Sequence, residues 1–314
     1  MRIVKIGNRL VGEGHPCFIT AEIGINHNGS LEIAKQLIGL AVQYGADAVK
    51  FQKRSVPMVY SPDELSKPRE VPREHLEHAI RRGALPEENV RRLRATDFRE
   101  TTNGDQKWML ELTADEYREI NRYCREKGIV WYASPWDVGS VDFLEEFNPP
   151  CYKVASALLT HKELLRRIRE TGRPVVVSTG MSTEEEIYEA LKTLGDEVII
   201  LHCTSSYPSE NHELNLEYLK RLREIFHHPV GYSGHETDLI PSVIAAAHGA
   251  CMVERHITLD HGMYGSDQKA SLDPDGLNKL VKYIRVLPVI MGDGRKVVYP
   301  SEIPIRDKLR RVTA

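Results

Sequence analysis

The segment PVVVSTGMSTEEEIYEALKTLGDEVIILHC, residues 174–203, contains two short apolar runs separated by a stretch with the spacing of an amphipathic helix. The first run ends at Ser178, and the second ends at His202 and Cys203. An apolar run, a helix and a second apolar run in this order are typical of a β-α-β unit, in which the two strands are parallel. The segment therefore predicts a parallel sheet covered by helices.

The same alternation extends outward over most of the chain and gives eight apolar runs that end in polar residues. They are CFITAEI (17–23), ADAVKFQ (46–52), IVWYASPW (129–136), CYKVASA (151–157), PVVVSTG (174–180), VIILHC (198–203), PVGYSGHE (229–236) and CMVERHI (251–257). The 314-residue length suits a barrel of about 250 residues with an insertion. We therefore predict an α/β fold, a (β/α)8 TIM barrel, whose catalytic groups lie at the carboxyl ends of the strands.

Residues 1–314 are interpreted as a single barrel domain with three additions. Residues 1–14 read as a hairpin that turns at Gly7 and Asn8 and plugs the barrel floor. Residues 54–113 interrupt the alternation after the second strand, and their length indicates a partly helical insertion over the barrel mouth. Residues 292–314 form a tail with a basic KLRR segment.

Helices are expected where capping residues border the amphipathic stretches. The stretch 30–45 opens on Ser30 and closes on Gly45, and 113–128 opens with a Thr-x-x-Glu capping box. Similar patterns predict helices near 138–147, 160–171, 183–194, 214–226, 238–248 and 273–291.

The overall composition restricts the class of partner. With 42 basic and 45 acidic residues the net charge is −3, so neither a nucleic acid nor a membrane partner is expected. The first 14 residues have no apolar stretch of signal-peptide length, and no later run reaches the roughly 18 residues of a membrane span. A cytoplasmic location is expected. The five cysteines include no CxxC pair, which favours buried reduced thiols.

Two lysines inside apolar runs, Lys50 and Lys153, require something that compensates their desolvation. A bound anion would do so, because hydroxyl donors end the neighbouring strands and would complete a pocket for a phosphate and a carboxylate. The alternative is that each lysine pairs with an acidic residue of the barrel and each serine merely ends a strand. The hydroxyl donors are Ser134, Ser156, Ser178 and Ser233.

Three histidines, His202, His235 and His256, also fall at strand ends. Imidazole binds borderline divalent metals, and His235 and His256 would lie on adjacent strands, so their rings can converge on one ion. The alternative for each is a buried histidine bonded to the backbone. Glu22, inside an apolar strand, reads as a proton-transfer group or as a salt-bridge partner of a lysine, and Asp267 reads as a general base or a turn former.

The order and spacing of eight motifs resemble the sialic acid synthase family over essentially the whole chain. The motifs are EIGINHNG (22–29), VKFQ (49–52), SPW (134–136), YKVAS (152–156), STGMS (178–182), LHCTSSYP (201–208), GYSGHE (231–236) and ERHIT (254–258). The resemblance implies a transferase that condenses phosphoenolpyruvate with an N-acyl hexosamine, such as N-acetylmannosamine. The products would be a nine-carbon keto acid and phosphate, and the implied cofactor is Mn²⁺ or Mg²⁺.

The resemblance also assigns roles to individual residues. It implies that His235 and His256 bind the metal, that His202 supports them, and that Glu22 and Asp267 hold the amino sugar. Lys50 and Lys153 would act on phosphoenolpyruvate together with a set of polar contacts, in which Ser205 replaces the more usual Asn. These contacts would be Gln52, Ser134, Ser156, Ser178, Ser205, Tyr207 and Ser233.

Two departures from the family pattern bear on mechanism and substrate. Many members carry an acidic residue, credited with proton handling, where this chain has Leu158 after Ala157. Many bacterial members also continue into an antifreeze-like domain whose Arg reaches the sugar of a neighbouring subunit. A separate antifreeze-like protein is one expected replacement, and an arginine of the insertion is another, the candidates being Arg91, Arg92, Arg94 and Arg99.

The resemblance further implies a homodimer. Two other functions stay open from the sequence: a related synthase that uses a phosphorylated or shorter aldose, and a barrel that binds a sugar acid without turnover.

Overall fold

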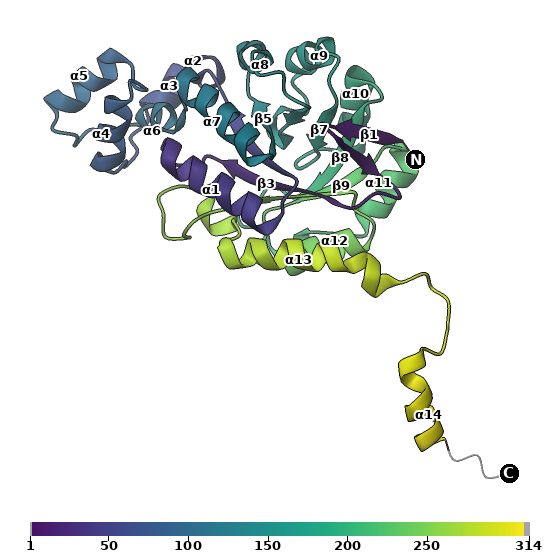
Figure 1. The fold of residues 1–314 in the computed structure, drawn as a ribbon. Coiled ribbons are helices and arrows are strands. Elements are labelled where there is room, and N and C mark those ends of the chain that lie inside the picture. The colour runs from purple at the N-terminus through teal and green to yellow at the C-terminus, as the bar shows by residue number, and fades with distance from the viewer. Residues whose placement is uncertain (1, 311–314) are drawn as a thin grey trace.

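The computed structural model describes residues 2–310 and has a ring of eight parallel strands with helices outside it (Figure 1). The strands coincide with the eight apolar runs, which confirms the predicted barrel. They are β3 (Phe18–Gly24), β4 (Ala48–Lys53), β5 (Val130–Pro135), β6 (Tyr152–Val154), β7 (Val175–Ser178), β8 (Val198–Cys203), β9 (Val230–Gly234) and β10 (Met252–His256).

In the strand order β5-β4-β3-β10-β9-β8-β7-β6, the last barrel strand along the chain, β10, pairs with the first, β3. β5 and β6 lie next to each other and complete the ring. The register sets polar residues side by side at the mouth, because Glu22 is level with Lys50 on one side and with His256 on the other. Gln52 is likewise level with Ser134. Parallel pairing therefore brings side chains far apart in the sequence to one end of the barrel.

The helices outside the barrel begin and end close to the predicted positions. Ser30 caps the first helix by accepting from Ile33 N, and Thr113 forms the predicted capping box with Glu116. These helices are α1 (Leu31–Tyr44), α7 (Ala114–Lys127), α8 (Val138–Glu145), α9 (Lys162–Glu170), α10 (Glu184–Leu194), α11 (Tyr218–Phe226), α12 (Ile240–Ala247) and α13 (Pro274–Met291).

The N-terminal hairpin, β1 (Ile3–Ile6) with β2 (Arg9–Gly12), turns at Gly7 and Asn8 as the sequence predicted. Val4, Ile6 and Val11 are buried against residues at the starts of the barrel strands, including Phe18 and Cys251. Burial of these apolar side chains closes the barrel floor at the end opposite the mouth.

The insertion between β4 and α7 folds into five short helices around a core of its own. None of the described residues in 54–113 lines the central cavity of the barrel. Its core includes Leu76, Leu93 and Met109. The helices, which project from the mouth end in Figure 1, are α2 (Val56–Val59), α3 (Pro62–Ser66), α4 (Arg73–Arg81), α5 (Glu87–Ala95) and α6 (Asn103–Leu110).

After α13 the chain runs away from the barrel and ends, within the described part, in α14 (Ile303–Leu309) (Figure 1). The predicted tail extends to residue 314, and residues 311–314, with the last Arg of KLRR, lie outside the described residues, as does Met1 of the hairpin. Within 2–310, none of the helices combines the length and the apolar character that a membrane crossing requires.

Candidate active site

A cavity of about 190 Å³ opens at the carboxyl ends of the strands, inside the ring. Of the residues to which the family resemblance assigned a catalytic, substrate-binding or metal-binding role, all but one line this cavity. They are Glu22, Lys50, Gln52, Ser134, Lys153, Ser156, Ser178, Ser205, Tyr207, Ser233, His235 and His256. Asp267 is the exception, and it lies beside the cavity in the loop after β10.

Two lysines and two glutamates form the centre of the site. Lys50 Nζ lies 2.9 Å from Glu22 Oε2 and 3.8 Å from Glu254 Oε1, and Lys153 Nζ lies 3.4 Å from the same Glu254 oxygen. All four side chains are buried. The lysines therefore pair with acidic residues of the barrel, which was the alternative interpretation. Both lysines also line the cavity.

The two carboxylates differ in their electrostatic environment. Burial and the neighbouring Glu254 raise the pKa of Glu22, although Lys50 opposes the change. Burial would also raise the pKa of Glu254, but the ammonium groups of Lys153 and Lys50 lower it below its ordinary value. Glu254 is thus the ionised partner of both lysines, and Glu22 is the carboxyl group suited to carry a proton.

Each lysine also donates to a serine at the end of the next strand. Lys50 Nζ donates to Ser134 Oγ over 3.2 Å, and Lys153 Nζ donates to Ser178 Oγ over 2.7 Å. Because each serine oxygen accepts from an ammonium group, its own O–H remains able to donate to a ligand in the cavity. The arrangement provides paired ammonium and hydroxyl donors, which suit an anionic ligand.

Ser156 and Ser205 line the cavity next to Gly180. Gly180 N donates to Ser156 Oγ over 3.1 Å, and a Cβ on Gly180 would lie only 2.1 Å from Ser205 Oγ. A larger residue at 180 would therefore push the two serines out of the cavity wall.

His235 and His256 face each other across neighbouring strands, with ring centroids 5.6 Å apart. His235 Nδ1 donates to Thr204 O over 2.7 Å, which leaves Nε2 with a free lone pair. Nδ1 of His256 has no hydrogen-bond partner in the described part of the chain and lies 3.8 Å from Asp267 Oδ2. Burial lowers the pKa of His256 to about 3, so its imidazole is neutral.

These donors fit a divalent ion held by two imidazoles. Metal-binding histidines commonly donate their second N–H to a carbonyl or carboxylate, as His235 does to Thr204. Within residues 2–310, no three His, Cys, Asp or Glu side chains are arranged to hold an ion alone. Oxygens of substrate and water would have to complete the coordination.

His202 does not face the cavity. Its Nε2 lies 2.7 Å from Leu214 O, so it has the backbone-bonded role that was the alternative for every histidine. Its neighbour Cys203 does line the cavity and lies 3.7 Å from His235 Nδ1. All five cysteines are free thiols, as expected.

Glu254 is the functional residue that sequence reasoning missed. It belongs to the ERHIT motif, but only His256 of that motif was given a role. The available signal was an acid inside the apolar run CMVERHI, the same signal that singled out Glu22. Trp136 and Met181 also line the cavity without having been predicted.

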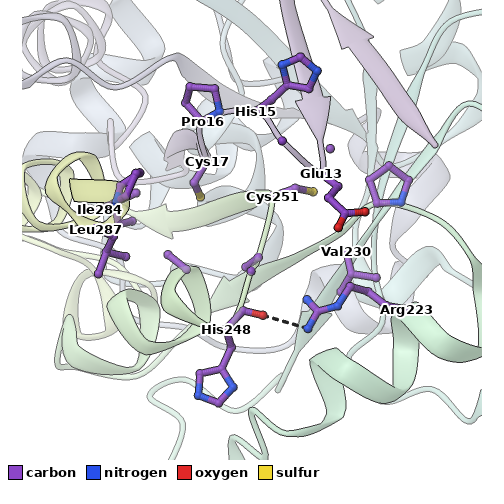
Figure 2. A pocket seen from close by; sticks show the side chains of 17 residues that line it. Glu13, His15, Pro16, Cys17, Arg223, Val230, His248, Cys251, Ile284 and Leu287 are labelled. Carbon is purple, nitrogen blue, oxygen red and sulfur yellow. Dashed lines mark hydrogen bonds between the residues drawn. The ribbon is translucent and has the colours of Figure 1, made fainter. Parts of the chain in front are cut away.

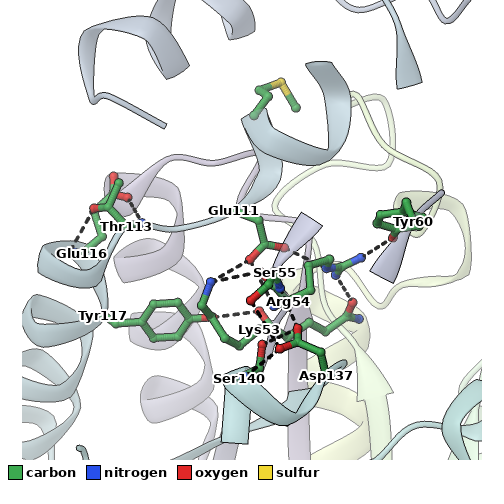
Figure 3. Close-up of polar contacts among 12 residues, drawn as sticks. Lys53, Arg54, Ser55, Tyr60, Glu111, Thr113, Glu116, Tyr117, Asp137 and Ser140 are labelled. Atoms are coloured by element: carbon green, nitrogen blue, oxygen red, sulfur yellow. Dashed lines mark hydrogen bonds and ion pairs between the residues drawn. The ribbon is translucent and has the colours of Figure 1, made fainter. Parts of the chain in front are cut away.

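A buried polar network joins the insertion to the barrel beside this site (Figure 3). Arg54 Nε lies 2.8 Å from Glu111 Oε1, and Arg54 also donates to Tyr60 Oη over 3.0 Å and to Gln52 Oε1 over 2.5 Å. Asp137 accepts from Ser55 N over 2.7 Å, where the chain leaves the barrel. Through Arg54, the network holds the side chain of Gln52, which is one of the predicted substrate contacts.

The four arginines proposed to replace a missing sugar contact lie elsewhere. None of them lines the cavity, and they belong to α5 and the turn after it, at the outer end of the insertion in Figure 1. Arg92 is bound to both carboxylate oxygens of Asp105 at 2.6 Å. That hypothesis is therefore wrong for the protein chain as it is folded here.

A larger cavity, of about 390 Å³, lies at the opposite end of the barrel (Figure 2). Its wall includes Cys17, Cys251 and Arg223, and Arg223 donates to His248 O over 2.9 Å. Burial raises the pKa of the Cys251 thiol to about 12 and raises that of Cys17 as well, so both thiols stay protonated. Barrel chemistry is found at the carboxyl ends of the strands, which favours the smaller cavity.

Comparison with known proteins identifies the family of this chain. An uncharacterized protein of Methanocaldococcus jannaschii is 37% identical over 99% of this chain and 82% of its own length. The human N-acetylneuraminate-9-phosphate synthase is 38% identical over 96% of this chain and 78% of its own. The crystal structure of an N-acetylneuraminic acid synthetase from Leptospira borgpetersenii, solved with citrate, superposes with a TM-score of 0.77 at 27% identity, covering 99% of this chain and 98% of that one. Residues 94–296 match the NeuB family, and the chain belongs to that family.

Proposed function

We propose that this protein condenses phosphoenolpyruvate with an N-acyl hexosamine to give a sialic-acid-like nonulosonate and phosphate. The observation that carries the proposal is the cavity in which Lys50 and Lys153, each with a serine hydroxyl, face the two imidazoles of His235 and His256. Such a site has an anion-binding wall and a metal-binding wall within one cavity. Its relatives, named as synthases of N-acetylneuraminate and its 9-phosphate, support the same reaction.

The lysines and serines bind phosphoenolpyruvate in this proposal. The carboxylate and the phosphate of the substrate accept from Lys50, Lys153 and the O–H groups of the neighbouring serines. Glu254 favours the charged form of both lysines, because it is the anion that they share. The lysines and serines that hold the substrate are therefore already oriented before it binds.

The acceptor sugar lies between that wall and the histidines. A divalent ion bound by His235 and His256 would polarise the aldehyde oxygen of the open-chain sugar. Carbon 3 of phosphoenolpyruvate attacks the aldehyde carbon, water adds at carbon 2, and phosphate leaves by cleavage of the C–O bond. Glu22 gives a proton to the aldehyde oxygen, because burial raises its pKa. Of the two protons of the water, one returns to Glu22 and the other leaves with the phosphate.

This assignment supplies a carboxyl group for the proton transfer that Leu158 cannot perform. Leu158 is buried in the core, and its neighbour Ala157 is the residue that lines the cavity. The proposal also includes a cytoplasmic homodimer, an expectation that comes from the composition and from the resemblance.

The test is release of inorganic phosphate from phosphoenolpyruvate with Mn²⁺, scanned over N-acetylmannosamine, its 6-phosphate, diacetylated 6-deoxyhexosamines and mannose. Release that requires both the metal and an N-acyl hexosamine is expected. Release with an unsubstituted or shorter aldose would instead favour a related synthase. Saturable phosphoenolpyruvate binding without release for any sugar would favour a barrel that binds without turnover.

A further inference from the structure

A buried ion pair connects the residue after His235 with the residue before His256. Arg255 precedes His256 on β10, and Glu236 follows His235 just beyond the end of β9. Arg255 Nη1 lies 2.8 Å from Glu236 Oε1, and both side chains are 1% exposed. Because successive side chains of a strand point to opposite faces, Arg255 points out of the ring while His256 lines the cavity.

Further hydrogen bonds tie this pair to β9, to the loop after it and to α12. Arg255 Nη1 also donates to Asp238 O over 2.9 Å and to Ser242 Oγ over 3.0 Å. Its Nη2 donates to the backbone carbonyl of Glu236. The Glu236 carboxylate accepts from Ser242 Oγ over 3.1 Å and from Tyr232 Oη over 2.8 Å. Arg255 of β10 is therefore bound to the neighbouring segment at several points.

A glycine makes room for the carboxylate beside the strand. Gly234 is level with Arg255 across the two strands. A Cβ on Gly234 would lie 2.6 Å from Glu236 Oε2 and 2.7 Å from Tyr232 Cε1. Because glycine has no Cβ, the carboxylate can lie against the backbone of β9 immediately before His235.

The pair contributes geometry more than stability. Desolvation of two buried charges offsets most of their attraction, and an apolar pair of similar volume is often as stable. Several hydrogen bonds in fixed directions instead give β9 and β10 one relative position at the level of the histidines. His256 depends on that position, because its Nδ1 has no hydrogen-bond partner in the described part of the chain.

We propose that Arg255 and Glu236 are positioning residues that set the distance between the imidazoles of His235 and His256. The inference rests on the proposed function, in which these two rings bind a divalent ion. Two ligands bind one ion tightly only when their lone pairs meet at one point, so a shift of β10 against β9 weakens binding. Neither positioning residue lines the cavity, and their effect passes through the backbone at the strand ends.

The experiment measures free Mn²⁺ by electron paramagnetic resonance in the native protein, in Glu236→Gln, and in Glu236→Gln combined with Arg255→Met. The single variant leaves a buried guanidinium without its counter-charge and can unfold the protein. The double variant removes both charges and keeps an amide that can bond to Tyr232 and Ser242. Urea unfolding of each protein establishes that it is folded under the conditions of the binding measurement.

Glu116→Gln is the matched control. It breaks the ion pair of Arg82 with Glu116, whose charged atoms lie 2.7 Å apart and whose side chains are 10% and 13% exposed, and neither residue lines the cavity. We expect the Kd for Mn²⁺ to rise about 10–100-fold in both Glu236 variants and to stay within about 2-fold of the native value in the control. Loss of a buried ion pair alone does not produce that difference.

The outcomes separate positioning from folding and from the reaction. Native affinity for Mn²⁺ in the folded double variant would overturn the positioning role, because the pair would then serve stability alone. An equal loss of affinity in Glu116→Gln would overturn it as well. Absence of phosphate release from a native protein that binds Mn²⁺ would overturn the proposed reaction, and the binding comparison would still decide the positioning role. A native protein that binds no Mn²⁺ would overturn both.

Discussion

Glu254 Oε1 lies 3.4 Å from Lys153 Nζ, and both groups belong to side chains less than a tenth exposed. Burial and the nearby Lys50 lower the pKa of Lys153, and Glu254 opposes this change. The same carboxylate lies 3.8 Å from Lys50. One acid therefore sustains the positive charge of two lysines that face the cavity.

We expect Glu254→Gln to weaken phosphoenolpyruvate binding by a factor of about 10–100 at pH 8, because the pKa of Lys153 falls further when its counter-charge is removed. The sign is fixed by the direction of that shift: a lower pKa leaves less ammonium as pH rises, so binding should recover as pH falls. Calorimetric titration of both proteins between pH 6 and 9 checks this. Parallel pH profiles would contradict a charge-sustaining role.

The two facing imidazoles predict the site of metal binding. His235→Ala and His256→Ala should each weaken Mn²⁺ binding at least about 100-fold, because each removes one of the two proposed protein ligands. Free Mn²⁺ measured by electron paramagnetic resonance reports binding without any substrate. His212→Ala, at an exposed histidine that does not line the cavity, serves as the control and should bind as the native protein does.

The pair of Arg54 and Glu111 should be a major contributor to the stability of the insertion. Both side chains are less than a tenth exposed, so Glu111→Gln leaves a buried guanidinium without its charged partner and should cost about 3–5 kcal/mol. Urea unfolding measures the loss, and limited proteolysis should show cleavage first within 54–113. The exposed pair Arg73 and Glu77 is the comparison: Glu77→Gln should cost less than about 1 kcal/mol.

The hairpin provides a test of the barrel floor. Ile6 is fully buried, so Ile6→Ala should lower the free energy of unfolding by about 2–5 kcal/mol. Ile3, on the same strand, is 46% exposed, and Ile3→Ala should change it by less than about 0.5 kcal/mol. Similar losses in the two variants would mean that the hairpin does not close the floor.

Lys107→Gln should stabilise the fold at pH 7. In the folded protein the pKa of Lys107 drops from its ordinary 10.5 to about 8. Between these values the unfolded chain binds more protons, so this group makes the native protein more stable as pH rises from about 8 toward 10.5. Thermal unfolding at pH 7 and 10 checks both points: the variant should have the higher Tm at pH 7, and its advantage should shrink at pH 10.

The residues at the strand ends show how far the sequence alone reaches. An apolar run must be buried on both faces of a parallel sheet, so a polar residue at its end must lie at the barrel mouth. That constraint placed Lys50, Ser178 and His256 in one cavity before any coordinates were known. Helix ends were equally predictable, since the cap at Thr113 depends on residues only three positions apart.

The partner of each charged residue was decided by the tertiary structure. Whether Lys50 faces an anion or an acid of the barrel depends on the register between β3, β4 and β10, and the structure shows that Glu22 and Glu254 both reach it. His202 carried the same strand-end signal as His235 but turns to the backbone of Leu214. The strand pattern shows how far along the barrel axis a residue lies. The direction of its side chain depends on neighbours that are distant in the sequence.

The sequence by itself determined the barrel, its mouth and the set of residues that gather there, because burial and strand period are local properties of the chain. Only the tertiary structure decided that Glu254 is shared by two lysines and that Asp267 lies within 3.8 Å of His256 beside the cavity. Those relationships join segments separated by tens to hundreds of residues. Their distances are set by packing of the whole domain, which no single segment contains.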